Sequence, residues 1–286
     1  MQLIVNGILM GAVISIGAVG LTLVSRILHF FYFGYAAMLV YGAYLTMTLF
    51  NDVGLPLILA VLVSLPLLSL MAILIDKITF KHLRKRGTGP FGMMVVGIGL
   101  ELFLRSSVRL LWGSDVMRYD LPIRRAILLP FNVRITPNQF VIITASLILM
   151  LLLHLFLDQT KIGKAMRATA DNIDLAKVRG INTERVIMWT WVIASISAGF
   201  AGFFLALDTR LVPIMGWKLL LPLFAAVILG GVGNPYGALA GGMIIGISQE
   251  VSAGFITPTY KPAVAFIIMT MTLLIKPSGL FGRGGQ

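Results

Sequence analysis

The sequence predicts an all-α, polytopic transmembrane helix bundle, and three observations support this fold class. Hydrophobic residues make up 58% of the 286 positions and charged residues only 12%, whereas soluble domains are roughly 45–50% apolar and about 25% charged. The apolar residues gather in runs near the ~20 residues that a helix needs to cross a bilayer. Short basic segments separate these runs. We therefore expect a single multi-pass transmembrane domain over residues 1–286.

The apolar runs define nine candidate spans, and eight to ten crossings are compatible with the pattern. The second and seventh runs are short, and only Asn234-Pro235-Tyr236 separates the seventh from the eighth. Either helix in that region could be broken or re-entrant, which membranes tolerate where protein or water satisfies the backbone. In chain order the candidate spans are 2–25, 34–50, 55–76, 90–112, 137–158, 186–207, 217–233, 237–256 and 260–276.

Basic residues predict the orientation, because cytoplasmic loops are enriched in lysine and arginine. The loop after the third span and the segment 161–185 are the two basic segments, and two spans separate them, so both are placed on the cytoplasmic side. Residues 113–136 then form an outer loop, in which the alternation in Phe131–Ile135 predicts a short strand. The first basic loop contains Lys77, Lys81, Arg84, Lys85 and Arg86.

The segment 161–185 is a charged island between two apolar spans, and its helical periodicity is amphipathic. At ~100° per residue its apolar and charged side chains separate onto opposite faces. This order predicts a surface helix with a binding face, ended by Gly180 before Asn182 or Thr183 starts the next span. The apolar face contains Ile162, Ala165, Met166, Ile173 and Ala176. The charged face contains Lys164, Arg167, Asp171, Asp174 and Lys177.

Motifs for catalysis and nucleotide binding are missing from the sequence. There is no G-x-x-x-x-G-K-[ST] loop for ATP, no H-E-x-x-H zinc motif and no cysteine, and the three histidines are scattered. We expect no catalytic residue, no metal site, no cofactor on this chain and no nucleic-acid partner. Small residues at four-residue spacing, such as Gly7 and Gly11 or Gly242 and Gly246, predict close helix packing in lipid.

Polar residues inside apolar spans are costly and are therefore candidates for a solute pathway. Glu101 lies in the middle of the fourth span with Arg105 four residues on, on the same helical face, and Glu250 lies in the eighth span. Either carboxylate could instead serve packing between helices. Asn234 lies in a stretch rich in glycine that weakens a helix, as in the broken helices of transporters.

Several motifs together resemble a known family. The pattern from Gly163 to Ile181, G-x-A-M-R-A followed by A-x-x-x-G-I, resembles the cytoplasmic coupling segment of permeases from ABC importers of the branched-chain amino-acid type. The block Leu229–Gly242, the opening Asn6-Gly7 and the ending Lys276–Gly282 are similar to further motifs of that family. The resemblance covers nearly the whole chain, in order, and the length suits the shorter of the two permeases of such an importer.

The resemblance implies a mechanism and a set of partners. The coupling segment would dock in a groove of separate cytoplasmic ABC ATPase subunits, which hold ATP and Mg²⁺. A second related permease, an external solute-binding protein and a prokaryotic inner membrane complete the implied assembly. The implied coupling residues are Gly163, Met166, Arg167, Ala168, Asp171, Ala176, Gly180 and Ile181, and the candidate pathway residues are Asn6, Glu101, Asn234 and Glu250.

One departure leaves the substrate open. The family usually has N-F-A-H-G after the first span, where this chain has Tyr32-Phe33-Gly34-Tyr35-Ala36. Branched-chain or other hydrophobic amino acids are the first expectation, and relatives of this type also carry urea and short amides. A secondary transporter that uses Glu101 and Glu250 for ion coupling is the alternative from another class. An integral membrane enzyme has no supporting constellation.

Overall fold

The apolar runs form helices in this computed structural model, which describes residues 1–121, 127–129 and 133–282. Each of the nine predicted spans coincides with a helix. The helices that follow the spans in the first half are α1 (Gln2–Leu28), α2 (Tyr35–Met47), α3 (Leu57–Ile75) and α5 (Pro90–Trp112). Those of the second half are α6 (Pro137–Gln159), α9 (Thr183–Asp208), α10 (Met215–Gly230), α11 (Pro235–Ser252) and α12 (Lys261–Ile275).

Short elements connect these helices at the two ends of the bundle. Six of the long helical stretches are apolar and long enough to cross a membrane, while α2 and α10 are shorter. The connecting helices are α4 (Lys81–Lys85), α7 (Lys161–Asp171) and α8 (Ile173–Val178). Single turns of π-helix cover Thr48–Asp52 and Asp76–Phe80, and a 3₁₀ turn covers Pro258–Tyr260.

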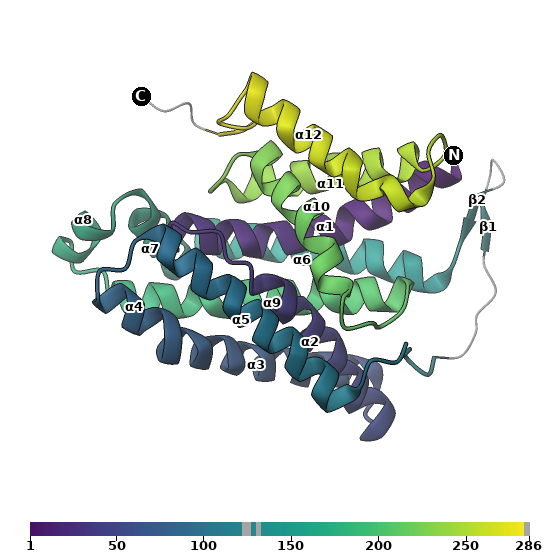
Figure 1. The fold of residues 1–286 in the computed structure, drawn as a ribbon, viewed down its shortest axis with the longest axis horizontal. Coiled ribbons are helices and arrows are strands. Elements are labelled where there is room, and N and C mark those ends of the chain that lie inside the picture. The colour runs from purple at the N-terminus through teal and green to yellow at the C-terminus, as the bar shows by residue number, and fades with distance from the viewer. Residues whose placement is uncertain (122–126, 130–132, 283–286) are drawn as a thin grey trace.

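The two basic segments lie at the same end of the bundle, as their spacing predicts (Figure 1). This end, defined by α4, α7 and α8, is called the inner end. The N-terminus lies at the opposite, outer end, beside strands β1 (Ile127–Leu129) and β2 (Val133–Ile135). The two strands pair antiparallel, with Leu128 opposite Arg134. The predicted strand is therefore confirmed over 133–135, while residues 131–132 lie outside the described part of the chain.

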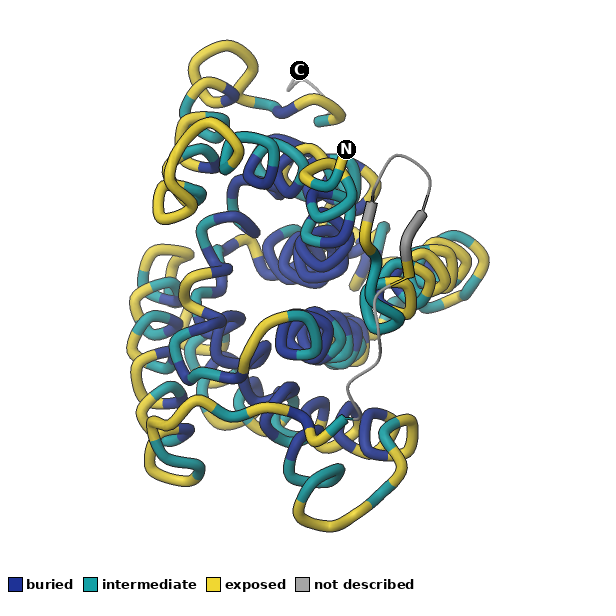
Figure 2. Tube along the Cα trace, turned by 90° about the vertical axis from the view of Figure 1, so that its right-hand side faces the viewer, coloured by how far each residue is buried: buried dark blue, intermediate teal, exposed yellow. Residues whose placement is uncertain are grey.

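Helices α1 and α9 form the centre of the bundle and the remaining helices surround them. The most apolar window of α1 is 89% buried and that of α9 is 78% buried, against 17% for α6 and 11% for α12. Figure 2 shows the same division, with buried residues along the middle and exposed residues along the rim. The exposed aliphatic side chains of the rim are suited to lipid.

Small residues allow α1 and α11 to approach closely, as the glycine spacing predicts. A Cβ on Gly246 would lie 2.2 Å from the backbone nitrogen of Gly11, and one on Gly242 would lie 2.5 Å from Cα of Ser15. A larger side chain at either glycine would separate the two helices. The turn between α10 and α11 is equally tight, since a Cβ on Gly230 would lie 2.1 Å from the carbonyl carbon of Gly237.

Candidate functional site

The charged island forms two helices, α7 and α8, and this corrects the expectation of one continuous helix. The break is at Asn172, whose φ of −158° and ψ of 110° are extended. The Asn172 side chain accepts hydrogen bonds from the backbone N–H groups of Asp174 and Leu175, at 3.0 and 2.9 Å. Asparagine caps helix N-termini well because its short side chain reaches these amides. The second helix therefore starts in a new direction at Asn172.

The end of α8 and the start of α9 follow the prediction. Gly180 has φ of +79°, the left-handed conformation that ends helices. The Ile181 N–H then donates to the Ala176 carbonyl at 3.0 Å. The side chain of Asn182 accepts from the Arg185 N–H at 3.0 Å and caps α9. The coupling segment is thus a defined structure between two long helices.

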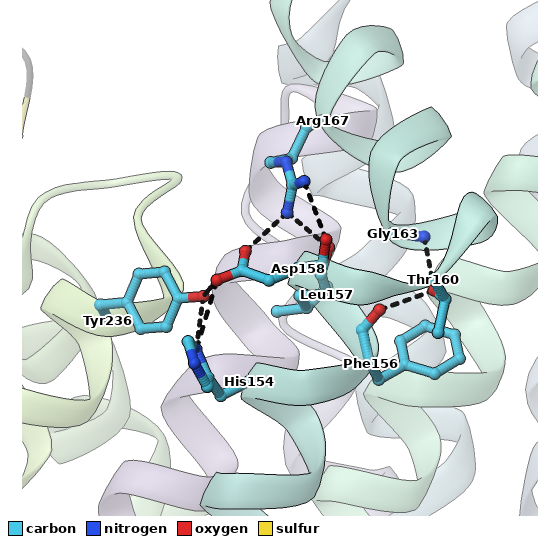
Figure 3. Close-up of polar contacts among 8 residues, drawn as sticks. All are labelled: His154, Phe156, Leu157, Asp158, Thr160, Gly163, Arg167 and Tyr236. Atoms are coloured by element: carbon cyan, nitrogen blue, oxygen red, sulfur yellow. Dashed lines mark hydrogen bonds and ion pairs between the residues drawn. The ribbon is translucent and has the colours of Figure 1, made fainter.

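Arg167 turns back from α7 to the end of α6 (Figure 3). Its guanidinium donates to the Asp158 carboxylate at 2.7 Å and also to the Leu157 carbonyl. The other oxygen of Asp158 accepts from the Tyr236 hydroxyl of α11 at 2.8 Å, and His154 Nδ1 lies 2.9 Å from that hydroxyl. Arg167 is half-buried and turns toward the protein, away from the exposed charged residues of the segment. The Asp158 carboxylate of α6 therefore contacts both α7, through Arg167, and α11, through Tyr236.

Backbone packing fixes the corner between α6 and α7. A Cβ on Gly163 would lie 2.2 Å from the Leu157 carbonyl oxygen, so only glycine fits there. The Thr160 side chain caps α7 by accepting from the Gly163 N–H at 3.0 Å (Figure 3). Met166 is 2% exposed on the inward side of α7. The end of α6 and the start of α7 are therefore packed closely against each other.

A cavity of about 640 Å³ lies between the coupling segment and the inner ends of the other helices. Arg26 of α1 borders it and reaches Asp171 of α7 at 3.0 Å. The C-terminal residues border the opposite side, including Ser278 and Phe281.

Asn234 borders this cavity at the inner end, and its polar atoms bind the protein itself. Its side-chain oxygen Oδ1 caps α11 by accepting from the N–H groups of Tyr236 and Gly237, at 3.1 and 3.2 Å. Its amide donates to the Phe281 carbonyl at 2.9 Å. Asn234 thus joins the α10–α11 turn to the C-terminal segment. A second hydrogen bond between these segments runs from the Leu280 N–H to the Leu229 carbonyl, at 2.7 Å.

The outward side of the coupling segment combines charge with exposed aliphatic groups. Leu175 is 55% exposed and Val178 is 84% exposed, both on α8. Figure 1 shows α8 as the most distant element at the inner end, beyond the ends of the long helices. Lys177 and Arg179 are exposed beside them, whereas Ala176 is buried. The outward side of α8 therefore exposes two aliphatic side chains next to charged ones.

The predicted pathway residue Glu101 is deeply buried in the middle of α5. Its side chain is 1% exposed, and one carboxylate oxygen lies 3.6 Å from Arg105 Nε. The other oxygen has no hydrogen-bond partner among the described residues. The Arg105 guanidinium lies 5.1 Å from the centre of the Trp217 ring of α10 and is 19% exposed. A charged group thus reaches the rim of the bundle within the membrane-spanning part.

The other two pathway candidates lie at the outer end and are bound by near neighbours. Asn6 accepts a hydrogen bond from Gln2 at 3.1 Å. Glu250 accepts from Lys261 Nζ at 2.5 Å, which joins α11 to α12. The structure therefore does not bring the four candidates into one site: Asn234 is at the inner end, Glu101 is central, and Asn6 and Glu250 are outer.

Tyr32 and Tyr35, which replace the family's usual asparagine and histidine, are both buried inside the bundle. Tyr32 packs edge-on against Trp191 with ring centres 4.9 Å apart. Tyr35 lies against Gly20, since a Cβ on Gly20 would be 2.3 Å from the Tyr35 hydroxyl. Neither tyrosine hydroxyl has a hydrogen-bond partner among the described residues.

Sequence reasoning missed the residues that fasten α7 to the core, namely Asp158, Tyr236 and Arg26. Asp158 is an isolated charge at the end of an apolar span, which is a weak signal. Among the residues that the structure describes, no group of three or more His, Asp or Glu side chains could hold a metal ion.

Comparisons with known proteins decide the family. The family model described as the branched-chain amino acid transport system permease component matches residues 3–273. The chain belongs to this family. The high-affinity branched-chain amino acid permease LivH of Escherichia coli K12 is 30% identical over 99% of the chain and 96% of its own length. A probable permease of the same name from Methanocaldococcus jannaschii is 30% identical over 93% of the chain and 87% of its own length.

A solved structure supports the fold. PsaBC from Streptococcus pneumoniae, solved in complex with a Fab, aligns with a TM-score of 0.52 at 16% identity and covers 97% of this chain and 93% of that one. The resemblance read from the motifs is confirmed, and the chain is a multi-pass permease of this family.

Proposed function

We propose that this chain is the translocation subunit of an ATP-driven importer for branched-chain or other hydrophobic amino acids in a prokaryotic inner membrane. The names of the relatives that match nearly the full length support this substrate class. ATP and Mg²⁺ would bind separate ATPase subunits, since the sequence has no phosphate-binding loop of its own. Transport would proceed by alternating access.

The exposed surface of α8 is the observation that supports the ATPase partner best. Leu175 and Val178 expose aliphatic groups on α8, which lies beyond the ends of the long helices. Lys177 is exposed between them and forms an ion pair with Asp174 at 3.1 Å. A small apolar patch surrounded by charge is the usual composition of a protein interface. The ATPase groove would bury these two side chains.

Movement of the ATPase would reach the spans through the contacts behind α7. The Arg167–Asp158 pair and the close approach of Gly163 to Leu157 join α7 to α6, and Tyr236 extends the link to α11. The Arg26–Asp171 pair adds α1. A displacement of the coupling segment would therefore turn α6, α11 and α1 together.

The rim around Arg105 is the candidate contact with a second permease. A charged side chain costs about 2.5–3.5 kcal/mol at the centre of a spanning helix and normally faces protein or water. Covering by a related permease would bury Arg105 and Trp217 and place the unpaired oxygen of Glu101 near the central pathway. An external solute-binding protein would deliver substrate to the outer loop 113–136.

Association with the ATPase tests the proposal. The permease is co-expressed with a candidate ABC ATPase, and the complex is purified through a tag on the permease. Leu175→Ser combined with Val178→Ser should reduce ATPase recovery about tenfold, which requires the two truncations together to cost about 1.4 kcal/mol of binding free energy. Val116→Ser is the matched control, since Val116 is 54% exposed on the outer loop. Full recovery with the double variant would refute docking at α8.

Competition for uptake tests the substrate. Proteoliposomes that contain the full importer should accumulate labelled leucine, and excess isoleucine or valine should compete with it. Excess urea or a short amide should leave leucine uptake unchanged. Uptake of urea that branched-chain amino acids do not affect would instead assign this chain to the transporters of urea and amides.

A further inference from the structure

A second cavity at the inner end lies apart from the coupling contacts already described. It measures about 320 Å³ and lies between the end of α3 and the start of α9. Lys77 and Lys81 border it on one side, Glu184 and Arg185 on the other, and Trp191 is also part of its lining. The proposed transport mechanism gives this cavity no role.

Its two carboxylates already have partners. Asp76 accepts two hydrogen bonds from the Arg84 guanidinium, at 2.7 and 3.1 Å. Glu184 pairs with Lys81 at 3.0 Å. Lys77 and Arg185 form no ion pair with any carboxylate in the described part of the chain. The cavity therefore keeps two positive charges that its own acidic residues do not neutralise.

Trp191 adds a third unused donor. The side chain is 1% exposed, and its indole N–H has no acceptor among the described residues. Trp191 stacks on Phe80 with ring centres 5.5 Å apart, which fixes the ring. A buried donor without an acceptor destabilises the protein, and a bound oxygen would remove part of that cost. The indole N–H of Trp191 and the unpaired charges of Lys77 and Arg185 together favour a ligand with negatively charged oxygen atoms.

The cavity lies next to a surface suited to lipid. Ile73 borders it one helical turn before Lys77. The neighbouring stripe on the same helical stretch exposes Leu70, Leu74 and Ile78, which are 56%, 47% and 70% exposed. Trp191 lies eight residues into α9, about 12 Å along the helix at 1.5 Å per residue, so the cavity extends from the inner surface to about the level where the acyl chains begin.

We propose that this cavity binds the phosphate headgroup of an anionic phospholipid of the cytoplasmic leaflet. Lys77 and Arg185 would bind the phosphate oxygens, and the acyl chains would lie along the stripe of Leu70, Leu74 and Ile78. Basic cavities between helices on the cytoplasmic side are suited to anionic headgroups. The lipid would join α3 to the start of α9, directly after the coupling segment.

Native mass spectrometry of the intact permease tests this proposal, with phosphatidylglycerol titrated against phosphatidylcholine. Lys77→Gln combined with Arg185→Gln should weaken phosphatidylglycerol binding about thirtyfold, because each basic residue near a membrane surface contributes about 1 kcal/mol and about 1.4 kcal/mol corresponds to a factor of ten. Trp191→Phe should weaken it severalfold. The control is Lys85→Gln combined with Arg86→Gln, which removes the same charge from exposed positions of the first basic loop outside the cavity.

Three outcomes would overturn the proposal. Equal loss in both double variants would show that only the overall charge matters. Displacement of the lipid by millimolar inorganic phosphate would assign the cavity to a soluble phosphate. Unchanged lipid binding combined with lost ATPase recovery in the Lys77 and Arg185 variant would assign the surface to the protein partner. Selective loss with retained thermal stability would support the lipid site.

Discussion

Arg167 of the coupling helix donates to the Asp158 carboxylate at the end of α6, with 2.7 Å between Nη1 and Oδ1. The amphipathic pattern of the segment groups Arg167 with the outward charges, but the structure directs it to the core. Its place in the family motif therefore has a physical reason: Arg167 fastens the coupling helix to the spans. The surface left for a partner is formed by α8 and the remaining exposed charges.

Reversing this charge should uncouple α7 from α6. Arg167→Glu places a carboxylate against Asp158, and we expect uptake to fall about tenfold, within the range usual for coupling between sites, together with lower ATPase recovery. Membrane insertion should be normal. The exchanged pair, Asp158→Arg with Arg167→Asp, should recover part of the uptake. Normal uptake and ATPase recovery in Arg167→Glu would exclude a role for this residue in coupling.

Adding a single methyl group at Gly163 should disturb the same corner. Gly163→Ala forces a Cβ against the Leu157 carbonyl, and overpacking of this kind costs about 1–3 kcal/mol. The thermal unfolding midpoint in detergent should fall accordingly. Gly89→Ala is the control, because a Cβ there would meet nothing within 4 Å. An equal midpoint for both variants would contradict the packing described at Gly163.

Removing the Tyr35 hydroxyl should not destabilise the fold. That hydroxyl is buried without a partner, so Tyr35→Phe should leave the unfolding midpoint unchanged or raise it. Tyr119→Phe provides the contrast, since the Tyr119 hydroxyl donates to the Ala43 carbonyl at 2.9 Å and its loss should cost about 1 kcal/mol. A clear loss of stability in Tyr35→Phe would show that its hydroxyl has a bonding partner in the native protein.

Asn234 caps α11 in the structure, whereas the sequence predicts that it lies in the solute pathway. Two substitutions separate these roles. Asn234→Asp keeps the oxygen that caps α11, whereas Asn234→Leu removes it and should cost about 1 kcal/mol. Both lose the amide that binds the Phe281 carbonyl. If Asn234→Leu unfolds at a lower temperature but transports with unchanged affinity and rate, the residue is not part of the solute pathway.

The sequence alone predicted the spans from the length of the hydrophobic runs, and the shared side of the basic segments from the placement of charge. It also predicted the end of the charged segment at Gly180 from the conformation that glycine favours. All three signals are local properties of the sequence. The break at Asn172 also had a local signal, an asparagine followed two residues later by Asp174. The Arg167–Asp158 pair and the contacts of Leu280 and Phe281 with the α10–α11 turn had none. They depend on how distant segments pack, and helical periodicity does not specify that.

Measuring ATP-driven uptake tests whether this permease takes its energy from a separate ATPase through α7 and α8. Proteoliposomes would contain the permease pair, the ATPase and the solute-binding protein, and leucine accumulation would be measured with ATP, without ATP, and with an imposed proton or sodium gradient. The account predicts accumulation only with ATP and the ATPase, and its loss in the Leu175→Ser, Val178→Ser variant. Accumulation driven by an ion gradient without ATP, and lost on replacement of Glu101 and Glu250, would contradict it.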